Sequence, residues 1–152
     1  MILALIASAF IVPAGQAFTC HATRVWDGDG PIWCEEGPRL RLAGIGVREL
    51  DGRCRPHQPC AKPSGIASRD HLVQLLGGAR GRTRDGHIIV RARLRCVSAG
   101  SGRGVRTAAW CSVGRTDLSC AMVADGFARR WATFWRERRC PDLRPARSGS
   151  RR

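Results

Sequence analysis

The chain has 152 residues and a formal net charge of +14, which arises from 26 basic and 12 acidic residues. This length is typical of one compact domain and excludes two domains with cores of their own. The positive charge favours attraction to a polyanion such as a nucleic acid. The alternative is a genome whose base composition favours arginine codons, since Lys62 is the only lysine.

Residues 1–17 are uncharged and mostly apolar, and they are predicted to form an export signal that is cleaved. Their apolar run is too short to span a bilayer as a helix. An uncleaved anchor is the alternative, because no Lys or Arg stands near Met1. The mature protein is expected to be secreted or periplasmic and to contain no membrane-spanning segment.

Eight cysteines follow this segment, and their even number predicts disulfide bonds formed in an oxidising compartment. Zinc is the alternative at Cys54, His57 and Cys60, which stand close together in the sequence. A structural zinc site normally closes with a fourth ligand, and the sequence shows no convincing fourth, so disulfides are favoured. The cysteines are Cys20, Cys34, Cys54, Cys60, Cys96, Cys111, Cys120 and Cys140.

Turn signals divide the first part of this domain into short strands. Strands are predicted at 18–26, 31–34 and 39–45, with turns at 27–30 (DGDG) and 35–38 (EEGP). Residues 46–63 are rich in Gly, Pro and Cys and are predicted to form a long loop. A helix is predicted at about 64–76. Its apolar face would consist of Ile66, Leu72, Leu75 and Leu76.

The second part of the domain is predicted to contain two strands, at 87–97 and 105–113, joined by a glycine-rich loop at 99–104. A last helix is predicted to begin near Asp117, and its continuation past Gly126 toward Trp135 is left open. Residues 141–152 are predicted to be a disordered basic tail. The inward side chains of the last helix would be Leu118, Met122, Val123 and Phe127.

Three separated motifs then point to a known family. They are VWDGDG at 25–30, RLAGIGVRE at 41–49 and GVRTAAWCSVGRTDLSCAMVADGFA at 104–128. With these motifs in this order, the chain resembles the thermonuclease family, the staphylococcal-nuclease-like domains, over roughly 18–135. The resemblance implies an α+β fold for residues 18–140: a five-stranded Greek-key barrel of the OB type with two to three packed helices. It also implies a monomer.

The same resemblance implies roles for single residues. Asp29 would bind a calcium ion, to which Val47 would offer its backbone carbonyl. Arg41 and Arg106 would hold the scissile phosphate of DNA or RNA, because a planar guanidinium matches pairs of phosphate oxygens. Glu49 would act as general base on the attacking water. Without the family motifs, Asp29 reads as an ordinary turn residue, Arg41 as a solvated strand residue, and Glu49 as a loop charge.

One departure from the family pattern affects the metal. Gly46 stands where the family has its second calcium carboxylate, and calcium normally takes six to eight oxygen ligands. The alternative function is therefore a nucleic-acid-binding module without turnover, and a third is a disulfide-stapled envelope protein whose charge is incidental. The missing charge would have to come from another acid, and the candidates are Asp27, Glu35, Glu36 or Asp51.

The fold implied by the resemblance also suggests how the cysteines pair. The expected bonds are Cys20–Cys34, Cys54–Cys60, Cys96–Cys111 and Cys120–Cys140. The five tryptophans are able to stack on bases, but the scarcity of other large aromatic residues favours positions in the core or covering the barrel for most of them. They are Trp26, Trp33, Trp110, Trp131 and Trp135.

Overall fold

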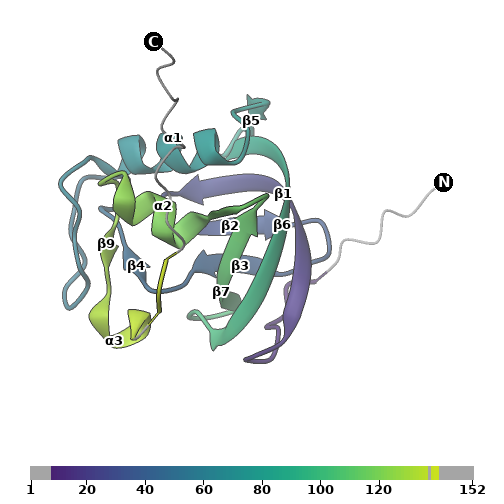
Figure 1. Cartoon of the computed structure of the whole chain (residues 1–152). Helices are drawn as coiled ribbons and strands as arrows, with labels where there is room; N and C mark the ends of the chain where they lie inside the picture. The colour runs from purple at the N-terminus through teal and green to yellow at the C-terminus, as the bar shows by residue number, and fades with distance from the viewer. Residues whose placement is uncertain (1–7, 137, 141–152) are drawn as a thin grey trace, which may run out of the picture.

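A closed five-stranded β-barrel with three helices forms the body of the computed structural model, which describes residues 8–136 and 138–140 (Figure 1). The sheet has the order β6-β1-β2-β3-β7, and β6 also pairs with β7, so that the barrel closes. Neighbouring strands are antiparallel except β3 and β7, which are parallel. The strands are β1 (Ala17–Asp27), β2 (Gly30–Cys34), β3 (Arg39–Leu42), β6 (Ile88–Ser101) and β7 (Arg106–Val113).

The barrel interior follows from the alternation of side chains along each strand. In β3, Leu40 and Leu42 are fully buried, while Arg39 and Arg41 point to the outside. The same alternation in the other strands fills the barrel with aliphatic side chains, whereas most arginines remain at the surface. The largest fully buried aliphatic residues are Ile32, Leu40, Leu42, Ile45, Leu72, Leu76, Leu94 and Leu118.

Helix α1 (Gly65–Leu75) begins where it is predicted, because the Ser64 side chain accepts a hydrogen bond from the Ala67 N–H. Leu72 is buried, but Ile66 is 50% exposed, so the prediction of an inward Ile66 is wrong. Six positions along a helix correspond to a rotation of about 240°. Ile66 therefore leaves the face that carries Leu72.

Helix α2 (Leu118–Ala124) is capped by Asp117, whose carboxylate accepts from the Cys120 N–H, and it does not continue toward Trp135. It stops before Gly126, which has a left-handed backbone with φ of +82°. The chain then returns to form β9 (Arg129–Arg130), which pairs with β4 (Ile45–Gly46), and ends in the short helix α3 (Ala132–Trp135).

Two further predictions differ from the structure. The strand predicted at 39–45 is broken into β3 and β4 by a turn at Gly44, where an added Cβ would lie 2.3 Å from the Trp110 ring. Strand β6 continues to Ser101, through part of the predicted loop 99–104. Short pairings complete the sheet at β5 (Gly81–Arg82) and β8 (Thr116–Asp117). The predicted tail, residues 141–152, and residues 1–7 of the predicted export signal lie outside the described residues.

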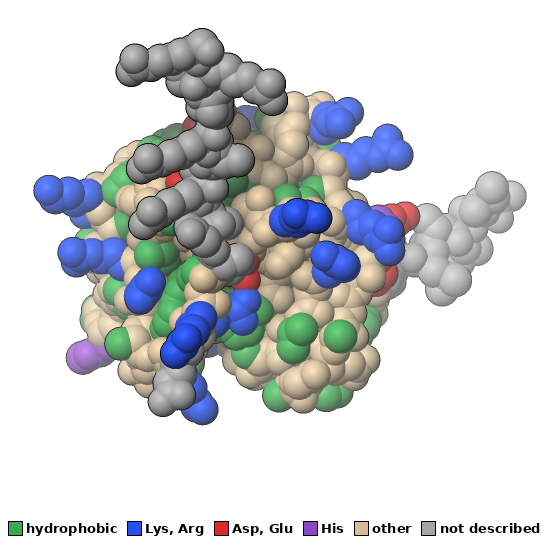
Figure 2. Space-filling model, in the orientation of Figure 1, with side chains coloured by type: hydrophobic (Ala, Val, Ile, Leu, Met, Phe, Trp, Pro, Cys, Tyr) green, Lys and Arg blue, Asp and Glu red, His purple; other side chains and the backbone are tan. Residues whose placement is uncertain are grey.

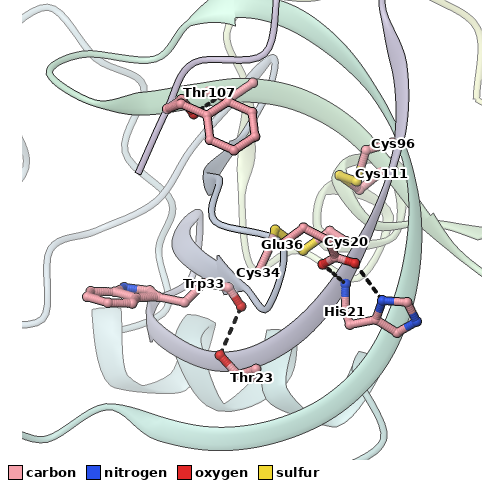
Figure 3. The surroundings of a disulfide bond; sticks show 10 residues. Cys20, His21, Thr23, Trp33, Cys34, Glu36, Cys96, Thr107 and Cys111 are labelled. Atoms are coloured by element: carbon pink, nitrogen blue, oxygen red, sulfur yellow. Dashed lines mark hydrogen bonds and ion pairs between the residues drawn. A yellow bond between two sulfur atoms is a disulfide. The ribbon is translucent and has the colours of Figure 1, made fainter. Parts of the chain in front are cut away.

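The predicted disulfide pairings are all confirmed. Figure 3 shows Cys20–Cys34 joining β1 to β2, next to the contacts that His21 makes with Glu36. The bond between Cys54 and Cys60 engages both thiols that the zinc alternative requires, so the disulfide interpretation holds there. Four disulfides are typical of a chain that folds in an oxidising compartment. Among the described helices, none has the length and apolar character needed to cross a membrane.

A segment preceding β1 packs against the barrel. Val12 is only 3% exposed, its N–H donates to Thr107 Oγ1 at 3.0 Å, and its carbonyl accepts from Ser98 Oγ at 2.7 Å. The Gly15 N–H donates to the Ser98 carbonyl at 2.8 Å, and the Ser98 N–H donates to the Gln16 carbonyl at 2.9 Å. These contacts join residues of the predicted export signal to β6 and β7.

Removal of residues 1–16 is expected to lower the free energy of unfolding by about 2 kcal/mol, because the burial of Val12 and its two hydrogen bonds are lost. Urea denaturation followed by circular dichroism measures this difference. A chain that starts at Phe10 is the matched control and is expected to unfold like the full chain. Equal stability of the chains starting at Phe10 and at Ala17 would contradict the prediction.

Candidate phosphate-binding site and acidic cluster

Arg41 and Asp29 meet because the DGDG turn is tied to β3. The Leu42 N–H donates to the Asp29 carbonyl at 2.8 Å, and Gly30 approaches so closely that an added Cβ would lie 2.3 Å from the Leu40 carbonyl oxygen. These close main-chain contacts bring the two side chains together, so that Arg41 Nη2 lies 3.3 Å from Asp29 Oδ2. The two side chains are only 14% and 15% exposed, so their ion pair is partly shielded from water.

Asp27 lies beside Asp29, and its carboxyl is buried. Burial is the largest cause that raises the pKa of Asp27, and together with the charge and side-chain hydrogen bond of Asp29 and the charge of Glu49 it brings this pKa to about 9, while the Asp29 N–H has the opposite effect. The Asp27 carboxyl is therefore protonated at neutral pH. The charges of Asp29 and Glu49 both act on Asp27, and these three acids are called the acidic cluster below; Arg41 contacts it through Asp29.

Glu49 is placed by the start of α1. An added Cβ on Gly65 would lie 2.1 Å from the Glu49 carbonyl oxygen, so the loop and the helix are in direct backbone contact. The Glu49 side chain is 27% exposed and pairs with Arg55, with Nε and Oε1 2.9 Å apart. The carboxylate is thus accessible from solvent, and a guanidinium group already lies against it.

Arg106 starts β7, and the parallel register places it opposite Arg39, while Arg41 lies opposite Ala108. Arg39, Arg41 and Arg106 alternate with buried neighbours and therefore share the outer face of the barrel. Arg106 Nε donates to the Arg103 carbonyl at 3.4 Å. However, Arg106 lines a different hollow from Arg41, and Arg103 lines both. The two predicted phosphate-binding arginines are on one face but do not converge on one cavity.

The cavity next to Arg41 has a volume of about 610 Å³, within the range of ligand-binding pockets. Trp131 lies 5.3 Å from the Arg41 guanidinium carbon, measured to the ring centre, and contacts Phe134 edge-on with centroids 4.8 Å apart. Aromatic walls and guanidinium groups in one cavity fit a base attached to a phosphate. The aromatic and charged lining residues are Arg41, Arg103, Trp110, Trp131, Phe134 and Arg136.

The structure provides a physical reason for glycine at position 46. An added Cβ there would lie 2.4 Å from the Pro59 carbonyl oxygen and 2.8 Å from Pro59 Cγ. The loop closed by the Cys54–Cys60 disulfide therefore occupies the space in which a second calcium carboxylate would have to stand. No carboxylate fits at position 46 unless this loop moves.

The residues present do not fit the two-carboxylate calcium site implied by the family. Asp29 is already paired with Arg41, and position 46 offers no carboxylate. The described part of the chain holds no group of three His, Cys, Asp or Glu side chains arranged for a metal ion. Two of the acids considered as substitutes are engaged elsewhere: Glu36 contacts His21, and Asp51 contacts Arg53.

Several residues of the Arg41 cavity were not singled out from the sequence, among them Phe134, Arg103 and Arg136. The interleaving of basic and aromatic residues in RRWATFWR at 129–136 is a signal that would have found two of them. Only Trp135 among the five tryptophans is buried in the core, while Trp110 is half-buried against it, as expected for a tryptophan that covers the barrel. The others are exposed or half-buried and line the surface hollows.

Surface charge on the described residues is consistent with a polyanion as partner. Figure 2 shows Lys and Arg side chains spread over one face of the molecule, with few acidic side chains between them. Comparisons of the chain with protein-family models, with curated proteins and with solved structures found no match. The geometry of the site and the motifs in the sequence therefore carry the functional interpretation.

Proposed function

We propose that the protein is an exported nuclease of the thermonuclease type, which binds DNA or RNA at the Arg41 cavity and hydrolyses a phosphodiester bond beside Glu49. The observation that carries this proposal is the position of Arg41, between the carboxylate of Asp29 at 3.3 Å and the ring of Trp131 at 5.3 Å. The strand order, with β3 parallel to β7, supports an OB-type barrel, a fold that commonly binds oligonucleotides.

In this reaction the Arg41 guanidinium donates hydrogen bonds to the phosphate oxygens and stabilises the charge that develops on them. Glu49 takes a proton from a water molecule, whose oxygen forms a bond to phosphorus. The bond from phosphorus to the leaving sugar oxygen breaks, and that oxygen takes up a proton from solvent. Arg55 has to release the Glu49 carboxylate for this step, since the two groups are 2.9 Å apart.

A second candidate is a binding module that holds nucleic acid without cleaving it. The contact between Gly46 and Pro59 favours this alternative, because it excludes the second acid of the family's metal site. The basic and aromatic surface alone is sufficient for binding, since phosphate contacts and base stacking require no catalytic carboxylate.

Cleavage of labelled single-stranded DNA and of RNA, with calcium or with a chelator, separates the two functions. For the nuclease, Glu49→Gln is expected to reduce the cleavage rate by about 10²–10⁴-fold, because the general base is lost, while binding persists. Arg41→Ala is expected to weaken both cleavage and binding.

The matched control for Glu49→Gln is Glu36→Gln, which removes an acid that is paired with His21 on another part of the barrel. This control is expected to cleave like the parent protein. Tight, salt-sensitive binding without cleavage by any variant would establish the binding module in place of the nuclease. Absence of both activities would exclude the two functions together.

A further inference from the structure

Four side chains form a continuous row across the outer face of four strands. The register pairs Arg24 of β1 with Trp33 of β2, Trp33 with Arg39 of β3, and Arg39 with Arg106 of β7. Each of the four is half-buried and is followed directly by a buried residue in its strand, so all four point outward. At a strand spacing of about 4.8 Å, three steps give a row about 14 Å long.

The row is held together by contacts with the Trp33 ring. The guanidinium carbon of Arg24 lies 3.6 Å from the ring centre and that of Arg39 lies 3.8 Å from it, both within the range of cation–π attraction. In Figure 3 the Trp33 ring points away from the Cys20–Cys34 disulfide. The ring therefore positions two cations at the surface in place of filling the core.

The charges of this row are not compensated within the described structure. Arg24, Arg39 and Arg106 pair with no carboxylate among the described residues, whereas Arg41 and Arg55 each pair with one. Three guanidinium groups of like sign in one line repel one another. An anion with several charges in a row would remove this repulsion.

A shallow hollow of about 520 Å³ lies next to the row and is lined by Arg39, Arg106, Trp26 and Trp33. Trp26 is 37% exposed, and its ring packs against His87 with centroids 4.8 Å apart. A fixed, exposed indole beside a line of arginines is a surface on which a base stacks while its phosphates contact the cations. Asp85 also lines the hollow, and His87 contacts this carboxylate at 2.9 Å.

The row is continuous with the Arg41 cavity, because Arg103 lines both the hollow beside Trp26 and that cavity. We propose that the row Arg24–Trp33–Arg39–Arg106 is a binding track for single-stranded nucleic acid that extends from the Arg41 cavity toward Trp26. A duplex does not fit this surface, since its bases are stacked on one another and are not free to stack on Trp26 or Trp131. This inference rests on the proposed function and names its substrate class.

The double variant Arg24→Gln/Arg39→Gln tests the track. With a chelator present, its affinity for a single strand of about 12 nucleotides, a length typical of one OB-type barrel, is measured as a function of salt concentration. Each phosphate contact contributes about 0.7 to the salt slope for single strands, so the slope is expected to fall by about 1.4. Affinity for a dinucleotide, which reaches only the Arg41 cavity, is expected to stay unchanged.

The matched control is Arg93→Gln/Arg95→Gln, which removes two exposed arginines of β6 and the same net charge. The control is expected to lower the salt slope by much less than the Arg24→Gln/Arg39→Gln variant does. Neither double variant is expected to bind a duplex of equal length better than the parent protein does. Equal losses in the two double variants would overturn the track, because net charge alone would explain them. A loss of duplex affinity as large as the loss for the single strand would overturn the choice of substrate.

Two further measurements keep the test decisive. If circular dichroism shows that the glutamine variant unfolds at a lower temperature than the parent protein, the test uses Arg24→Lys/Arg39→Lys, which keeps both charges. This variant is expected to retain the parent's salt slope. A lowered slope for the lysine variant would overturn the phosphate contacts. Binding by the track without cleavage of any strand would reject the proposed hydrolysis and leave the track standing. Cleavage of the dinucleotide, with no effect of the Arg24→Gln/Arg39→Gln variant on binding of the longer strand, would reject the track and support the proposed hydrolysis.

Discussion

The Asp27→Asn variant is expected to be more stable than the parent protein at neutral pH, by a margin that widens as the pH rises from about 4 to about 9. Burial, together with the charges of Asp29 and Glu49, raises the pKa of Asp27 from 3.8 to about 9 in the folded protein. The folded state therefore holds this proton more tightly than the unfolded state does.

The sign of the effect follows from this difference in proton binding. The stability from the Asp27 proton is fully present below pH 3.8 and is lost as the pH rises through about 9. The loss approaches about 1.4 kcal/mol per pH unit within this window. An asparagine keeps an oxygen for the Asp29 N–H and donates to the Asp29 carboxylate without a titrating proton, so the variant is expected to gain several kcal/mol at pH 8.

Urea denaturation at a series of pH values, with a chelator present, measures the free energy of unfolding of both proteins. The control is Asp51→Asn: hydrogen bonds from Arg53 lower the pKa of this exposed carboxyl, so its influence is confined to acidic pH. Parallel curves for the parent and Asp27→Asn between pH 5 and pH 9 would mean that Asp27 is ionised in the folded protein and that the acidic cluster carries more negative charge than inferred.

The Gly46→Asp variant is expected to be destabilised by about 3 kcal/mol or more and not to gain calcium-dependent cleavage. Its Cβ would lie 2.4 Å from the Pro59 carbonyl oxygen, so the loop closed by Cys54 and Cys60 has to move. Its carboxylate would also enter a buried position next to the Pro59 carbonyl oxygen, which repels a negative charge. The aspartate of the family pattern is therefore expected to lower the stability of this protein.

Gly46→Ala separates the two causes, because it adds the Cβ without the charge. Its expected cost is about 1–3 kcal/mol, as for other overpacked sites. Thermal and urea unfolding measure both variants, and calcium titration with a single-stranded DNA substrate measures activity. An aspartate variant as stable as the parent protein, with calcium-stimulated cleavage, would show that the loop yields and that the metal site is built in this fold.

The sequence predicted most of the barrel because the patterns involved are local. Alternation in RLRL places Leu40 and Leu42 inside, and Ser64 and Asp117 cap the two longer helices. Such patterns depend on neighbours within a few residues. The break at Gly44 was not predicted, because its cause is the Trp110 ring, which is distant in the sequence.

The candidate site shows the same distinction between features visible in the local sequence and features set by long-range contacts. The residue types and spacing of Asp29, Arg41 and Glu49 are visible in the sequence, and so is the loss of an acid at Gly46. Whether these residues meet, which partners they hold and whether Asp27 carries a proton depend on contacts between distant segments. Pairing of Glu49 with Arg55 is one such outcome of loop packing.

By itself, the sequence determined a small, strongly basic chain with disulfide bonds and short alternating strands, because composition, alternation and cysteine number act through local chemistry. The closure of these strands into a barrel was an implication of the family resemblance. Only the tertiary structure decided that Pro59 fills the space beside Gly46 and that Arg106 faces a second hollow in line with Arg24, Trp33 and Arg39. Strand register and the path of the loops bring together residues that are far apart along the chain. No pattern of sequence neighbours encodes the distances between such residues.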